Sequence, residues 1–250
     1  MAIFEIVAPR RHLLHGRGSR WFTNFSIVVL DSLIIRVLFP AAAVGIAVWA
    51  DENNIGLYPW AVAQGVAPPL WLFGVLVFMF MDMAIWAQHL VFHKVPVLWR
   101  FHKVHHSDPD FDVTTAIRFH PVEIVLSMVI KAVLIILLGA PALAIFLFEV
   151  VLNGAAMFNH SNVKLPGWFD GLLRKAIVTP DMHRVHHSIH RREIDSNYGF
   201  NFSIWDRIFH TYRAQPEDGH EGMTIGLKDY QNGEPVRLTW SLWLPFLRKN

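Results

Sequence analysis

Four long runs of apolar residues alternate along the chain with polar segments. The runs cover residues 26–50, 70–92, 122–138 and 141–158. A helix needs about 20 mostly apolar residues to cross a bilayer, so each run predicts a membrane-spanning helix. Little more than Gly139-Ala140-Pro141 separates the last two runs, which predicts a tight helical hairpin. The pattern predicts an all-α integral membrane bundle of about four transmembrane helices.

The composition supports a membrane location. Hydrophobic residues make up 53% of the chain and charged residues 17%, against about 25% charged residues in a typical soluble domain. The mean hydropathy is +0.33. We expect residues 1–215 to form a single membrane-embedded domain. Residues 216–250 are polar and contain glycine, and we expect them to form a loosely structured tail.

The distribution of basic residues predicts the orientation. Arg10, Arg11, Arg17 and Arg20 precede the first run, whereas residues 51–69 contain no lysine or arginine. Twelve of the 22 basic residues follow the fourth run. Because positive charge marks the cytoplasmic side, we expect both termini to be cytoplasmic, in a bacterial inner membrane or the endoplasmic reticulum. This basic face accounts for the isoelectric point near 9.0, so no nucleic-acid partner is predicted.

A few charged residues fall inside the apolar runs. Ionisable groups within spans are costly and usually face a functional interior. We expect Glu149 to pair with Arg36 or Lys131 inside the bundle, and the sequence does not separate these two partners.

Histidines form three tight blocks between residues 89 and 187. The first block is H-x-x-x-H, and the second and third are H-x-x-H-H. Residues three or four apart lie on one face of a helix, so each block presents its imidazoles together. The blocks comprise His89, His93, His102, His105, His106, His183, His186 and His187. They sit at or beyond the predicted cytoplasmic ends of the spans, which predicts a cytosolic, histidine-rich helical cap.

The blocks predict a metal centre. Neutral imidazole is the commonest protein ligand for iron, zinc, copper and nickel, and the chain has no cysteine to offer instead. The blocks hold more imidazoles than a four-coordinate site needs, so two metals in one cluster is the economical interpretation. A run of surface histidines is the alternative, and the repeated spacing disfavours it.

The three blocks, in this order and interleaved with membrane hairpins, resemble the fatty acid hydroxylase or sterol desaturase superfamily. Shorter motifs agree: Arg118-Phe119-His120-Pro121-Val122-Glu123, Asn159-His160-Ser161-Asn162, Asn197-Tyr198-Gly199 and Trp205-Asp206-Arg207-Ile208-Phe209. The resemblance implies a non-haem di-iron enzyme that uses O2 to hydroxylate or desaturate a lipid. It implies that the block histidines bind two Fe ions, which zinc is able to replace in a purified protein. It also implies one or two further histidine ligands between the second and third blocks, for which His160 is the first choice and His120 the second.

Carboxylates near the blocks are candidates for orienting the imidazoles. All-imidazole ligation is neutral, so nearby carboxylates would offset the charge of two divalent ions. Asp82 lies seven residues before His89 on the same predicted face, and Glu123 and Asp181 lie close to other candidate ligands. For Glu123 and Asp181, helix capping is an equally good explanation.

Two other functions remain compatible with a histidine-rich membrane protein: a metal transporter and a scaffold stabilised by metal. Transporters place ionisable ligands near the membrane midplane, unlike these blocks. As an oxygenase the chain needs an external electron donor, because it has no recognisable haem or flavin domain. We expect a cytochrome b5-like or ferredoxin-type protein to dock on the basic residues Arg174, Lys175, Arg191 and Arg192. The lipid substrate, whether sterol, fatty acyl or alkylglycerol-type, is left open.

Overall fold

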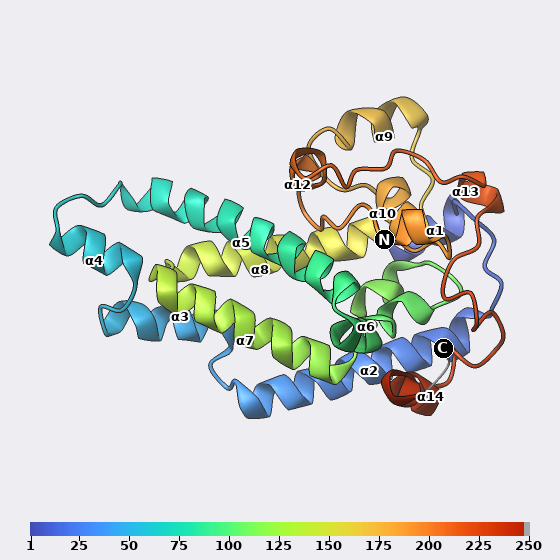
Figure 1. The fold of residues 1–250 in the computed structure, drawn as a ribbon, viewed down its shortest axis with the longest axis horizontal. Helices are drawn as coiled ribbons and strands as arrows, with labels where there is room; N and C mark the ends of the chain where they lie inside the picture. The colour runs from blue at the N-terminus through green and yellow to red at the C-terminus, as the bar shows by residue number, and fades with distance from the viewer. Residues whose placement is uncertain (248–250) are drawn as a thin grey trace.

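The computed structural model describes residues 1–247, and this part of the chain is built of helices and loops without β-strands (Figure 1). Within it, four helical stretches are long and apolar enough to cross a membrane. They are Arg17–Ala63, Leu70–Lys94, Pro121–Leu138 and Ala142–Asn159. Most residues of these stretches lie on the outside of the bundle, where apolar side chains would meet lipid. The predicted all-α, multi-pass membrane architecture is confirmed.

The first span differs from its prediction. Instead of one helix over residues 26–50, helix α2 (Arg17–Leu38) ends before Pro40 and α3 (Ala42–Glu52) begins after it. Proline lacks a backbone N–H and disfavours helical geometry in the residue before it, which explains the break. A short helix, α4 (Leu57–Ala63), then forms the end of the bundle farthest from the histidines (Figure 1).

The other spans match their predictions to within two residues. They are α5 (Leu70–Lys94), α7 (Pro121–Leu138) and α8 (Ala142–Asn159). Gly139 ends α7 in the left-handed region, with φ of 61°. There a Cβ atom would stand 2.9 Å from the Ile55 carbonyl oxygen, so the tight hairpin favours glycine.

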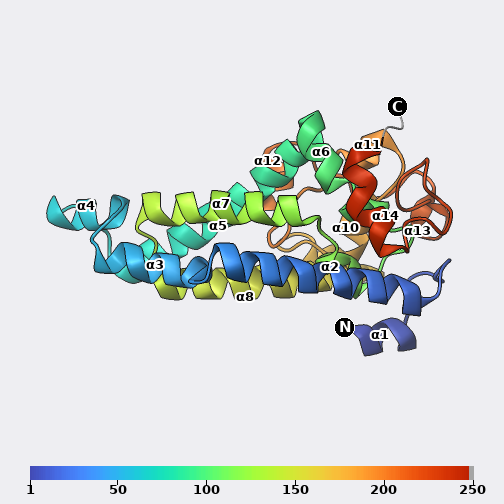
Figure 2. The same ribbon diagram turned by 90° about the horizontal axis from the view of Figure 1, so that it is seen from below.

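The long helices lie side by side and enclose an apolar core (Figure 2). Helix α3 packs against α7 and α8, and α5 packs against α8. The core consists of side chains that these helices turn inward, among them Ala47, Val77, Met81, Ile135 and Phe148. This bundle fixes the ends of α5, α7 and α8, on which the histidine region is built.

Short helices gather at one end of the bundle and form a cap (Figures 1 and 2). They are α1 (Ala2–Val7), α6 (Pro96–His102), η1 (His105–Ser107), η2 (Val113–Ile117), α9 (Gly167–Leu173), α10 (Pro180–His186), α11 (Arg191–Ile194), α12 (Ile204–Ile208), α13 (Gly219–Gly222), α14 (Leu238–Trp243) and η3 (Leu244–Phe246). Helices α1 and α14 both lie at this end. The histidine-rich helical cap is thus present, and its cytosolic side stays a prediction.

Residues 217–247 are not the loose tail that their composition indicated. Met223 and Ile225 are buried against Phe111, and Tyr230 and Leu244 pack on Val104. These contacts attach the segment to the cap, although Trp243, Phe246 and Leu247 stay exposed. The boundary between a domain of residues 1–215 and a tail of 216–250 stays a prediction.

Candidate metal centre

The histidine blocks come from three separate segments of the chain that meet inside the cap. His89 and His93 lie in the last two turns of α5. His102 ends α6, and His105 and His106 follow in the 3-10 turn η1. Helix α10 carries the third block, and Thr179 caps its N-terminus by accepting a hydrogen bond from the Met182 N–H.

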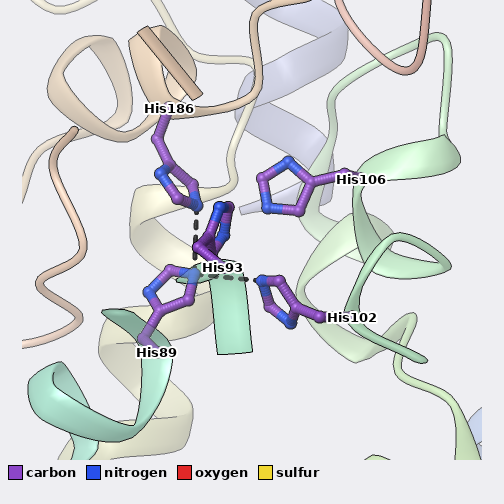
Figure 3. Close-up of side chains that lie close together, drawn as sticks. All are labelled: His89, His93, His102, His106 and His186. Atoms are coloured by element: carbon purple, nitrogen blue, oxygen red, sulfur yellow. Dashed lines mark hydrogen bonds between the residues drawn. The ribbon is translucent and has the colours of Figure 1, made fainter. Parts of the chain in front are cut away.

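Within the described residues, nine imidazoles form two buried groups, and in each group the candidate ligand atoms lie within 4.8 Å of one another. The first group contains His89, His93, His102, His106 and His186, which point toward one another in Figure 3. The second contains His105, His160, His183 and His187. Every histidine of the three blocks is included, and so is His160, the first choice for an additional ligand.

Each H-x-x-H-H block contributes to both groups. His102 and His106 belong to the first group, whereas His105 belongs to the second. The third block does the reverse: His183 and His187 belong to the second group and His186 to the first. With 3.6 residues per turn, adjacent helical side chains point about 100° apart, so neighbouring histidines diverge to opposite sides. The blocks therefore interlock the two groups.

Backbone carbonyls fix the tautomers of three imidazoles. The Nδ1 atoms of His89, His186 and His160 lie 2.7, 2.6 and 2.8 Å from the carbonyl oxygens of Tyr198, Ser196 and Ala156. A carbonyl oxygen is solely an acceptor, so each Nδ1 carries the proton and donates it. In a neutral ring this leaves Nε2 with an exposed lone pair, the form that binds metal.

These lone pairs face one another. The Nε2 atoms of His89 and His186 are 3.0 Å apart, and neither can donate to the other while both Nδ1 protons are engaged. The Nε2 atoms of His89 and His102 are 3.1 Å apart. Metal–nitrogen bonds of about 2.1 Å at a right angle would place two nitrogens about 3.0 Å apart. A shared cation satisfies this arrangement, and the donor set fits a divalent transition metal.

The ring nitrogens of two other imidazoles also indicate a metal site. Both nitrogens of His106 and of His187 are buried without a hydrogen-bond partner among the described residues. Buried polar groups are rarely left unsatisfied in native proteins. Burial also lowers the pKa of His102 and His160 to about 3. Imidazoles that resist protonation remain available as ligands around neutral pH.

A turn after α11 supplies the two carbonyls that hold the first group. Ser196 and Tyr198 flank Asn197, which has φ of 52°. Asp206 accepts hydrogen bonds from the backbone N–H groups of Tyr198 and Gly199, both at 2.9 Å. A Cβ at Gly199 would meet the Asp206 Oδ2 atom at 2.9 Å, so the close approach favours glycine. The Asn-Tyr-Gly and Trp-Asp motifs are thus bonded to each other and together position the imidazoles of His89 and His186.

Arg118 holds the second block from the opposite side. Its buried guanidinium donates to the Val104 carbonyl oxygen at 3.0 Å and to the Ser107 Oγ atom at 3.0 Å, on either side of His105 and His106. It also donates to the Asn24 side chain of α2 at 2.8 Å. The turn carrying these two ligands is therefore tied to the membrane bundle. Sequence reasoning noted the motif around Arg118 without this role.

One of the three predicted carboxylates contacts an imidazole of the two histidine groups. The Glu123 Oε1 atom lies 2.7 Å from the His102 Nδ1 atom. Asp82 instead accepts from the Trp205 Nε1 atom at 2.7 Å. Seven residues correspond to about 10 Å along a helix axis, so Asp82 shares a face with His89 but lies too far away to touch it.

Asp181 and His120 also differ from their predicted roles. Asp181 pairs with Arg10 and Arg184, because residues two apart on a helix do not face each other and His183 points elsewhere. His120 caps α7: its Nδ1 atom accepts from the Val122 N–H at 3.1 Å, and its Nε2 atom lies 3.3 Å from the Leu242 carbonyl oxygen. Both ring nitrogens are occupied, so His120 belongs to neither group.

The basic residues predicted to bind an electron donor are not all on the surface. Arg174 is buried, pairs with Asp170 and donates to the Ala214 carbonyl oxygen at 2.8 Å. This residue is therefore a structural contact of the cap. Lys175, Arg191 and Arg192 are exposed.

A cavity of about 310 Å³ connects the first group with the membrane helices. Its walls come from α2, α5, α7, α8 and η2, and they include His89 and His102. Lys131 and Glu149 also line it and form an ion pair with atoms 2.6 Å apart. Of the two partners predicted for Glu149, the structure selects Lys131.

Comparison with known proteins agrees with this geometry. The family model for fatty acid hydroxylase matches residues 74–211. The chain belongs to the fatty acid hydroxylase family. The match runs from α5 to the residues after α12 and includes the nine imidazoles of both groups. The predicted relationship is confirmed.

Relatives in this family carry the names of lipid-oxidising enzymes. The chain is 27% identical to an ornithine lipid hydroxylase of Rhizobium tropici over 224 residues, covering 86% of the chain and 64% of that protein. It is 30% identical to an alkylglycerol monooxygenase of Homo sapiens over 241 residues, covering 92% and 49%. It is 31% identical to a cholesterol 25-hydroxylase of Rattus norvegicus over 146 residues, covering 54% and 45%. The chain thus spans about half to two thirds of these relatives. No solved structure gives a significant match.

Proposed function

We propose that the chain is an O2-dependent membrane oxidoreductase that hydroxylates a lipid, with two iron ions held by the two histidine groups. The observation that carries this proposal is the convergence of imidazoles with bare Nε2 atoms beside a cavity that enters the membrane bundle. The names of the relatives, which are hydroxylases and monooxygenases, favour hydroxylation over desaturation.

The five imidazoles of the first group and the four of the second would each hold one iron ion. Bound iron would supply the oxidising power, with O2, to break an unactivated C–H bond. The chain's own residues provide the setting. Ile85, Phe92 and Phe200 line the cavity next to His89 and His102, so they exclude water and direct a lipid chain toward the first group.

The Glu123 carboxylate would offset the positive charge of a metal bound by the first group. Its carboxylate accepts the Nδ1 proton of His102 and keeps the His102 Nε2 atom free for the metal. Neutral imidazoles leave the charge of two divalent ions uncompensated. A single buried carboxylate against the first group reduces this charge without occupying a coordination position.

Catalysis requires electrons from another protein. Each hydroxylation consumes two electrons from outside the chain, as in other mono-oxygenases, and a cytochrome b5-like or ferredoxin-type donor would supply them. Such carriers are acidic, so the exposed Lys175, Arg191 and Arg192 on the cap favour their approach. The cap and both termini then lie in the cytoplasm, where the donor is.

Incorporation of labelled oxygen tests the proposal. The full chain is reconstituted in lipid nanodiscs with iron, a donor system and ¹⁸O-labelled dioxygen, and the lipids are examined by mass spectrometry. We expect a hydroxylated lipid that carries the label. The His186→Ala variant should form no such product, and His210→Ala should match the wild type, because His210 is exposed and lies in neither group.

Failure of this experiment has a defined meaning. A wild-type chain that holds its metals but labels no lipid with any donor would refute the proposal. Rapid exchange of those metals with the medium would then favour a transporter, and tight retention would favour a metal-stabilised scaffold.

A further inference from the structure

The cavity beside the first group carries more polar side chains than a plain hydrocarbon chain needs. Besides the Lys131–Glu149 pair, its lining includes Asp31, Gln88 and Ser127. Polar groups buried in a membrane bundle are costly and usually have a function. Each therefore requires a partner, either in the protein or in a ligand.

Most of these polar groups have a partner within the protein. Lys131 pairs with Glu149 at 2.6 Å. The Gln88 Nε2 atom donates to the Ser127 Oγ atom at 3.1 Å. These contacts hold α5, α7 and α8 together around the cavity, and each of these side chains has at least one partner within the protein, although the Gln88 Oε1 atom is unpaired among the described residues.

Asp31 is different. Its side chain is 5% exposed, and its Oδ1 atom is buried with no hydrogen-bond partner among residues 1–247. In that part of the chain no lysine, arginine or histidine forms an ion pair with it. Arg20, an arginine earlier in α2, is already paired with Asp108 and Asp112 at 2.8 and 2.7 Å.

The position of Asp31 places its carboxylate among the membrane helices. Asn24, seven residues earlier in α2, is bonded to Arg118 inside the cap. Seven residues correspond to about 10 Å of helix, so Asp31 lies well below the cap among the membrane helices. Asp31 lines the cavity, and its Oδ1 atom has no hydrogen-bond partner among the described residues. A buried acceptor is costly without a donor, and a ligand that enters the cavity can supply one.

We propose that Asp31 accepts a hydrogen bond from a hydroxyl or amine group of the lipid substrate, and so selects lipids that carry a donor. This inference rests on the proposed function, because it assumes that the cavity holds the substrate. A lipid whose polar groups are all esters or ethers offers acceptors alone and leaves Asp31 unpaired. Leaving a buried acceptor unpaired weakens binding by roughly tenfold or more.

Binding without turnover tests the subsite. The full chain, as purified with its metals, is titrated in nanodiscs without an electron donor. The probes are an O-alkylglycerol, its di-O-methyl ether and a long-chain amine of the same length. The wild type should bind at least one of the two donor lipids roughly tenfold or more tightly than the dimethyl ether.

Two substitutions separate the sources of the hydrogen bond. Asp31→Leu removes the acceptor, so the preference for a donor lipid should disappear. Asp31→Asn keeps a neutral acceptor of the same size. It should retain alkylglycerol affinity within about threefold if a hydroxyl is the partner, and lose roughly tenfold in amine affinity if an ammonium group is the partner. Asp51→Asn is the matched control, since Asp51 is an exposed carboxylate outside the cavity.

The outcomes are distinct from those of the oxygen-labelling experiment. Equal wild-type affinity for all three probes, or an undiminished preference in Asp31→Leu, overturns the subsite even if lipid is hydroxylated. Asp31→Asn is isosteric and provides this test if Asp31→Leu fails to fold. Its amide N–H groups can donate to an ether oxygen, so the preference for a donor lipid over the dimethyl ether should narrow, and an undiminished preference also overturns the subsite. A preference that depends on Asp31, without any labelled product, leaves the subsite standing and refutes the hydroxylase.

Discussion

Replacement of Glu123 separates the effect of a supporting carboxylate from that of a ligand. Glu123 touches His102 at 2.7 Å, and both side chains are buried. A carboxylate bonded to a ligating imidazole fixes the ring orientation and raises its basicity. Glu123→Ala removes the acceptor, whereas Glu123→Gln keeps a neutral one. Both variants should bind metal more weakly, with alanine the more severe.

The size of the effect follows from the charge of this hydrogen bond. A hydrogen bond to a charged group contributes about 1.5–3 kcal/mol, roughly twice the contribution of a neutral bond. Alanine should therefore cost about 2 kcal/mol of metal-binding free energy and glutamine about 1 kcal/mol. At 1.4 kcal/mol for each factor of ten, these losses weaken metal binding by roughly 30-fold and fivefold.

A chelator competition on the purified full-length variants measures this loss. Asp181→Asn is the control, because Asp181 lies two residues from His183 in the sequence but pairs with Arg10 and Arg184. It should leave both metal affinities within about twofold of the wild type. The reasoning is refuted if the Glu123 variants keep wild-type affinity, or if Asp181→Asn weakens metal binding as much as they do.

Three further predictions follow from the same geometry. His105→Ala and His106→Ala should each leave about one metal per chain, because the two residues belong to different groups. The double variant should hold about none, and a double variant that keeps one metal contradicts the assignment of the two residues to separate metal sites. The metal-free chain should lose thermal stability as the pH falls from about 6.5 toward 3. Burial lowers the pKa of His102 and His160 to about 3, so the unfolded chain binds more protons than the folded chain in that interval. An unchanged melting temperature between pH 8 and pH 5 contradicts this. A tag inserted near Asn54 should be labelled from outside the cytoplasm and one before Ala2 from within it, and the reverse pattern would overturn the orientation.

The membrane bundle follows from local sequence. Runs of apolar residues set the ends of α5, α7 and α8 to within two residues of where they lie, because hydrophobic length is a strong signal. Pro40 also carried a signal for the break between α2 and α3. The packing of the segment after Pro216 had no such signal, since a few apolar residues in a polar stretch do not reveal which surface they cover.

The candidate metal ligands were predictable as a set but not as two groups. Spacing of three and four residues puts imidazoles on one face, and this holds for His102 with His106 and for His183 with His187. Which group receives His105 or His186 depends on how α6 and α10 approach each other. The Ser196 and Tyr198 carbonyls that fix the tautomers of His186 and His89 are backbone groups. A pattern of side chains in the sequence does not predict where such carbonyls lie.

The two groups differ in their relation to the cavity, and this difference assigns them different tasks. Within the described residues, the lining of the cavity includes His89 and His102 of the first group and none of the second. Phe119, which lines the cavity, stacks on His105 of the second group, and Phe111 stacks on His160. Under the proposed function, a lipid in the cavity would therefore contact the first group and not the second. The interlocked blocks still tie both groups to the same turns, so a substitution in the second group should change turnover while leaving the lipid contacts at His89 and His102 in place.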